Sequence, residues 1–193
     1  MDISNLNRMR ILVTGLVTLL IFGLLFWEHF HGGVITHHIL QRKDLPGISN
    51  WWGVLLLPLM TWFLLGRIKT RLEKQASLTL HHKNETSEIL RLFLIGISFG
   101  IILAISFTYN YQLFLDNVLY LLLVLSLLVP IYYAEFTLGF VFGMTYTFGA
   151  IIPTAFVLII STIAFPIFKF VRPLFKKAIT YFRKRHPAES LNR

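Results

Sequence analysis

Long apolar blocks separated by short polar segments make up the chain from residue 11 to residue 168. Within each block the apolar residues run almost without interruption, which is typical of helices that have lipid as their solvent. A helix needs about 20 such residues to cross a bilayer, or slightly fewer with suitable flanks. We therefore predict an all-α, polytopic integral membrane protein with about six transmembrane helices. The predicted spans cover about residues 11–27, 50–65, 92–109, 117–133, 135–149 and 152–168.

The last two spans are separated by a turn that the apolar pattern alone does not show. As a single helix, the apolar stretch from Ala134 to Phe168 would be about 52 Å long at 1.5 Å per residue, whereas the hydrocarbon core is roughly 30 Å thick. The segment Gly149–Pro153 contains a glycine and a proline, which favour a turn. We expect the last two spans to form a tight hairpin folded at this segment.

The positions of the lysines and arginines predict the orientation. Two lie in the N-terminal tail, six between Arg67 and Arg91 and eight from Lys169 onward, so six spans place sixteen of the eighteen on one side. This agrees with the excess of basic residues in cytoplasmic segments, whereas five spans would place the basic tail outside. We predict cytoplasmic N- and C-termini in a bacterial cytoplasmic (inner) membrane, with residues 28–49 on the extracytoplasmic side.

Two parts of different character are predicted along the chain. Residues 1–170 form a single transmembrane helical domain, and residues 169–193 form a basic amphipathic tail on the cytoplasmic side. Its apolar and basic positions lie on different sides of a helix, which is typical of a segment that binds anionic lipid headgroups. Nucleic-acid binding would need a recognisable module, so we expect lipid and no nucleic acid as partner. Whether the chain forms homo-oligomers is left open.

Small residues recur at a spacing that lets helices approach closely. Gly96 and Gly100 are four residues apart in the third predicted span, and Gly139 and Gly143 are four apart in the fifth. Such pairs allow close backbone contact, although glycine is also common in membrane helices by chance. If these glycines pack, we expect contacts within one chain before contacts in a dimer.

Composition narrows the possible chemistry. The chain is 55% hydrophobic and 14% charged and contains no cysteine, which excludes disulfides, thiolate metal sites and cysteine nucleophiles. Few ionisable residues lie in the predicted spans. Glu135 is the one carboxylate close to an apolar block. At the inner membrane boundary water can solvate it, whereas deeper in the bilayer it would be costly and functional.

The most unusual segment is WEHFHGGVITHHILQRKD, Trp27–Asp44, which contains four of the seven histidines. Imidazole and carboxylate suit zinc, nickel, divalent copper or iron, and zinc is the ion we expect first. Gly32 and Gly33 can break the helix and fold the two histidine pairs toward each other. On one unbroken helix, Glu28, His31 and His38 would share one face, and His29 and His37 another. The candidate metal ligands are Glu28, His29, His31, His37, His38 and Asp44.

Three functions fit this segment. The first is a divalent-metal site that serves transport, sensing or metal-activated hydrolysis. The alternative is a non-catalytic membrane scaffold or assembly subunit whose loop is stabilised by histidine hydrogen bonds. A third is a pH-responsive loop. The sequence identifies no catalytic residue, so whether the protein is an enzyme is left open.

Overall fold

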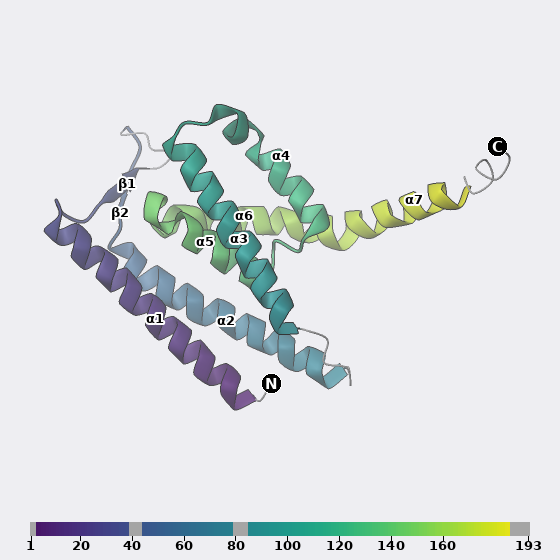
Figure 1. Cartoon of the computed structure of the whole chain (residues 1–193), viewed down its shortest axis with the longest axis horizontal. Helices are drawn as coiled ribbons and strands as arrows, with labels where there is room; N and C mark the ends of the chain where they lie inside the picture. Colours follow the sequence, from purple (N-terminus) through teal and green to yellow (C-terminus); the bar gives the residue numbers. More distant parts are fainter. Residues whose placement is uncertain (1–2, 39–43, 79–84, 186–193) are drawn as a thin grey trace.

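The computed structural model describes residues 3–38, 44–78 and 85–185, and these residues are almost entirely helical (Figure 1). This confirms the all-α class. The helices are α1 (Ile3–Phe30), α2 (Trp52–Leu78), α3 (Glu85–Thr108), α4 (Gln112–Leu128), α5 (Ala134–Phe148), α6 (Ile151–Pro166), η2 (Ile167–Val171, a π-helix) and α7 (Arg172–Arg185). Two three-residue strands, β1 (Thr36–His38) and β2 (Gly47–Ser49), lie between α1 and α2.

Four of the helical segments are long and apolar enough to cross a membrane. They cover Asn5–Phe30, Trp52–Ser77, Thr86–Thr108 and Ile151–Phe175. Helix α4 is apolar but has only 17 residues, and α5 has 15. The structure thus supports a helical membrane protein, and the count of six spans stays a prediction.

The shortest of the core helices, α5, lies at the centre of the fold. Most of its side chains are buried, whereas α1, α2, α3 and α4 carry many exposed large apolar side chains. Phe136 and Phe140 are fully buried in α5, and the Phe140 ring stacks on Phe156 of α6 with centroids 5.9 Å apart. This arrangement places the packed core around α5 and leaves apolar surface on the outer helices, as expected for contact with lipid.

Helices α3 and α5 pack backbone against backbone through all four glycines of the predicted pairs. A Cβ atom on Gly100 would lie 2.6 Å from the Phe140 carbonyl oxygen, and one on Gly143 would lie 2.5 Å from that of Ile97. Gly96 and Gly139 approach the opposite backbone just as closely. Gly96 meets the Phe136 backbone and Gly100 meets the Phe140 backbone, so residue numbers rise in the same direction along both helices. Helices α3 and α5 therefore run parallel. The expectation of glycine contacts within one chain is confirmed.

The turn predicted near Gly149–Pro153 is also confirmed. Helix α5 ends at Phe148, Gly149 adopts a positive φ of 67°, and α6 begins at Ile151. Beyond Pro166 the helix continues through η2 into α7. The tail is therefore helical as far as Arg185.

The antiparallel pair α1 and α2 defines two ends of the molecule (Figure 1). We call the end with β1 and β2 the loop end. The opposite end, where α1 begins and α2 finishes, we call the basic end. Glu28 at the loop end and Arg10 at the basic end are 18 residues apart on α1, or about 27 Å at 1.5 Å per residue, which is close to the roughly 30 Å thickness of a hydrocarbon core.

Candidate functional site

A small two-stranded ribbon shapes the histidine segment at the loop end. Helix α1 stops at Phe30, and Gly32 and Gly33 follow with φ values of 116° and 97°, which glycine adopts without strain. The chain then enters β1, which pairs antiparallel with β2 so that His37 lies opposite Ile48. Of the two geometries that the sequence left open, the structure has the helix break at the glycines, whereas the ribbon was not predicted.

The buried Glu28 carboxylate connects the end of α1 to this ribbon and to the start of α2. Glu28 is only 7% exposed. Its Oε2 accepts a hydrogen bond from the Ile35 backbone N–H at 3.1 Å, and its Oε1 accepts one from Asn50 Nδ2 at 2.8 Å. The Asn50 backbone N–H in turn donates to the Ile35 carbonyl at 2.9 Å. Glu28, Ile35 and Asn50 therefore form a closed polar group, which we call the Glu28 clamp.

Asn50 has a role other than the one its position suggested. Before a helix, asparagine or serine commonly caps the first turn, and Ser49 and Asn50 both precede α2. Instead, the Asn50 amide donates to Glu28, and Ser49 Oγ accepts a long 3.4 Å contact from the Trp51 N–H. The Asn50 side chain thus ties α2 to α1, 22 residues away in the sequence.

His37 lies beside this clamp and against the turn between α5 and α6. A Cβ atom on Gly149 would lie 2.9 Å from His37 Cδ2 and 3.2 Å from Asn50 Oδ1. Because Gly149 has no side chain, the loop that carries His37 can pack against the turn between α5 and α6. Among described atoms, the buried His37 Nε2 has no hydrogen-bond partner. Burial lowers the pKa of His37 below its ordinary value, while the Glu28 charge and a hydrogen bond with the Thr147 backbone act in the opposite direction.

The other three histidines do not converge on His37. His31 stacks on Trp27 with ring centroids 3.6 Å apart, and its Nδ1 hydrogen-bonds the Trp27 carbonyl at 2.9 Å. His38 uses Nδ1 to bond the Leu45 carbonyl at 2.9 Å, which links β1 to the segment before β2. His29 is exposed and meets the edge of Phe30.

The predicted metal ligands are therefore distributed over the loop end. Asp44 is exposed in the turn that precedes β2 and takes part in an interaction of its own. Within residues 3–38, 44–78 and 85–185, the structure brings together no group of three His, Asp or Glu side chains that could hold a metal ion. Residues 39–43, between the second histidine pair and Asp44, lie outside the described residues, as do His81 and His82.

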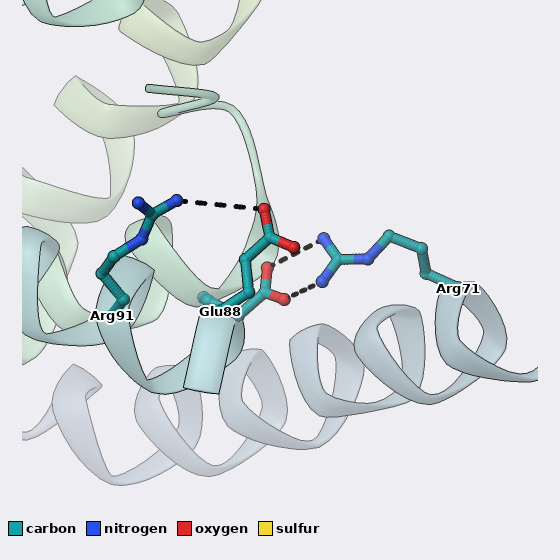
Figure 2. A network of polar contacts seen from close by, with 4 residues as sticks. Arg71, Glu88 and Arg91 are labelled. Atoms are coloured by element: carbon teal, nitrogen blue, oxygen red, sulfur yellow. Dashed lines mark hydrogen bonds and ion pairs between the residues drawn. The ribbon is translucent and has the colours of Figure 1, made fainter. Parts of the chain in front are cut away.

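A second buried carboxylate, Glu135, lies at the basic end. Its side chain has no exposed surface and forms a bidentate ion pair with Arg71 of α2, whose Nη1 lies 3.2 Å from Glu135 Oε2. The Arg71 guanidinium also lies over the Tyr133 ring, 4.3 Å from its centroid. The dashed lines in Figure 2 mark the two bonds of this bidentate pair at Arg71 and the separate Arg91–Glu88 contact, which is 4.0 Å long and exposed. Arg71 therefore neutralises the carboxylate that the sequence identified as costly to bury.

Comparison with protein-family models, with curated proteins and with solved structures gives no match for this chain. The geometry of the two polar sites is therefore the basis of the functional argument. The sequence identified Glu28, the histidines and Glu135, but it did not link to them three residues that complete their surroundings. These are Asn50, Gly149 and Arg71.

Proposed function

We propose that the protein is a non-catalytic, multi-pass membrane scaffold that presents a fixed loop on the extracytoplasmic side for the assembly of other membrane components. The observation that carries this proposal is the Glu28 clamp. Both carboxylate oxygens of Glu28 are occupied by groups of the protein itself, an amide N–H at 3.1 Å and a side-chain amide at 2.8 Å. A carboxylate held in this way orders the loop and has little freedom to ligate an ion or to transfer a proton.

The surroundings of the histidines support the same function. His31 and His38 each bond a backbone carbonyl nearby, and His37 seats the ribbon on the α5–α6 turn. Each contact reduces the freedom of the loop, which favours a preformed binding surface because less conformational entropy is lost when a partner binds. Trp51 and Trp52 are exposed beside this loop, and aromatic side chains are enriched in interface cores.

Helix directions support the orientation that the basic residues predict. Helix α5 begins beside Arg71 at the basic end and finishes beside His37 at the loop end. It runs parallel to α3, as the third and fifth spans of a six-span protein must. Six alternating helices would place the loop end outside and both termini on the cytoplasmic side.

Metal content distinguishes the scaffold from the metal-site alternative. The wild-type protein would be purified in detergent without added chelator, and its metal content measured per chain beside that of His31→Ala/His38→Ala. Thermal unfolding would be recorded with and without EDTA. The scaffold predicts less than one tenth of an ion per chain in both proteins and the same midpoint with EDTA. If the wild type holds one ion per chain and the double variant holds none, the scaffold proposal is wrong and the metal-site function takes its place.

The clamp itself is tested by Glu28→Gln. One of the two donors then faces an amide NH₂ group, and losing a hydrogen bond to a charged acceptor costs about 1.5–3 kcal/mol. His29→Gln is the matched control, because His29 is exposed on the same turn. The proposal requires Glu28→Gln to lower the unfolding midpoint while His29→Gln leaves it unchanged.

A further inference from the structure

A basic groove lies between α1 and α2 at the basic end, far from the Glu28 clamp. It has a volume of about 620 Å³. Its lining residues are Arg10, Phe63, Gly66, Arg67, Thr70, Arg71 and Lys74. Four of these seven residues are cationic and none is acidic. The Thr70 hydroxyl donates to the Gly66 carbonyl at 3.1 Å.

Arg10 is held in a fixed position at one wall of this groove. Its guanidinium lies 3.8 Å from the centroid of the Trp62 ring, and its Nε donates to the Trp62 carbonyl at 2.9 Å. A Cβ atom on Gly66 would lie 2.9 Å from Arg10 Nη2, so the glycine provides the space in which the guanidinium lies. Aromatic stacking and one backbone bond leave the remaining N–H groups of Arg10 available as donors.

The cations of the groove differ in how far their charge is already balanced. Arg71 is paired with Glu135 and therefore contributes little net charge. For the carboxylates that the structure describes, none is paired with Arg10, Arg67 or Lys74, since Glu73 pairs with Lys69 and Glu88 with Arg91. Three cations without a partner among the described carboxylates thus face one groove and repel one another, and a bound anion would relieve this repulsion.

We propose that this groove binds a phosphate group, and that the phosphate belongs to the headgroup of an anionic phospholipid. Arginine guanidinium groups and a lysine ammonium group are donors that recognise phosphate oxygens. The groove lies about one hydrocarbon thickness from the loop end, at the level expected for lipid headgroups. Phe63 in its wall and Leu59 one turn before it are 60% and 66% exposed, so an acyl chain can continue along the apolar side of α2. A free phosphate ion would satisfy the cations but leave this apolar path unused.

Native mass spectrometry of the full chain in a non-ionic detergent tests this site. The probes are phosphatidylglycerol, phosphatidylcholine with the same acyl chains, and inorganic phosphate. The charge variant is Arg67→Gln/Lys74→Gln. Its matched control, Arg8→Gln/Arg91→Gln, removes the same charge from exposed positions outside both the groove and the basic tail. A third variant, Gly66→Ala, keeps the net charge and displaces only the flexible end of Arg10.

We expect phosphatidylglycerol to bind the wild type at least tenfold more tightly than phosphatidylcholine. Arg67→Gln/Lys74→Gln should weaken its binding about 30-fold, or roughly fivefold for each cation near an anionic lipid surface. Gly66→Ala should weaken it roughly fivefold, whereas Gly23→Ala, where a Cβ atom meets nothing within 4 Å, should have no effect.

The lipid source is overturned if inorganic phosphate binds the groove and phosphatidylglycerol shows no preference over phosphatidylcholine. The whole site is overturned if the groove variant and the surface-charge control lose phosphatidylglycerol equally, because the attraction would then be general. None of these results depends on whether the loop end acts as a scaffold.

Discussion

Removal of Arg71 should destabilise the protein more than removal of its partner Glu135. The two are joined by a bidentate ion pair, but the Glu135 side chain is 0% exposed whereas that of Arg71 is 27% exposed. Breaking a buried ion pair costs roughly 3–5 kcal/mol, largely because the remaining charge is left without a partner in an apolar surrounding. Arg71→Gln leaves a fully buried carboxylate alone. Glu135→Gln leaves an arginine that can turn toward water.

The magnitudes follow from the same contacts. Arg71→Gln should cost about 3 kcal/mol for the unpaired carboxylate, and the lost contact with Tyr133 adds roughly 0.5–1 kcal/mol. Glu135→Gln should cost about 1–2 kcal/mol, because the Arg71 left behind is partly solvated. This cost includes about 0.5 kcal/mol for the lost attraction between a carboxylate in the first turn of α5 and the helix dipole. At roughly 2–4 °C per kcal/mol, Arg71→Gln should lower the unfolding midpoint by about 7–15 °C and Glu135→Gln by about 2–8 °C.

Thermal unfolding in detergent, followed by circular dichroism, measures both variants. Arg91→Gln is the control, because its pair with Glu88 is 4.0 Å long and exposed, and such pairs contribute under about 1 kcal/mol. The double variant Arg71→Gln/Glu135→Gln should be more stable than Arg71→Gln alone. An equal or smaller shift for Arg71→Gln than for Glu135→Gln would refute the reasoning from burial.

Three further predictions concern other parts of the molecule. Burial lowers the pKa of His37, so the folded state prefers the neutral ring. The contribution of His37 to the free energy of unfolding should be complete above about pH 6.5 and should fall as the pH drops below this value. Unfolding midpoints measured from pH 5 to 8 should show this dependence in the wild type and a flatter one in His37→Phe. Gly139→Ala places a methyl group against the Phe93 backbone and should lower the midpoint by several degrees, whereas Gly15→Ala, where the space is open, should raise or preserve it. A peptide of residues 169–186 should gain helicity on anionic vesicles and lose binding as salt rises; equal affinity for neutral vesicles at all salt concentrations would contradict its electrostatic attachment.

The sequence predicted most of the helical framework because each helix is encoded locally. Long apolar blocks indicate lipid-facing helices without knowledge of their neighbours, and the Gly149 turn and the helix break at Gly32 and Gly33 follow from backbone preference alone. The glycine pairs were found for a similar reason, since four-residue spacing is a property of one helix. Three-residue strands carry no such signal, because β1 and β2 contain too few residues to show an alternating pattern.

The sites were predicted less well because they depend on residues far apart in the chain. Asn50 meets Glu28 across 22 residues, and Arg71 meets Glu135 across 64. A polar residue before a helix is commonly a cap, so its local context gave Asn50 a different role. The histidines are close in the sequence, but the Trp27 stack and the Leu45 carbonyl direct His31 and His38 to different partners. Nearness in sequence did not make them one cluster among the described residues.

Hydrogen exchange at the loop end measures whether the Glu28 clamp orders the loop. The Ile35 amide donates to Glu28 and the Asn50 amide donates to the Ile35 carbonyl, so both should exchange slowly in the wild type. The account predicts that Glu28→Gln speeds exchange at both amides at least tenfold, with α3 and α5 unchanged and the His29→Gln control equal to wild type. Fast exchange at Ile35 and Asn50 in the wild-type protein, or unchanged exchange in Glu28→Gln, would contradict it.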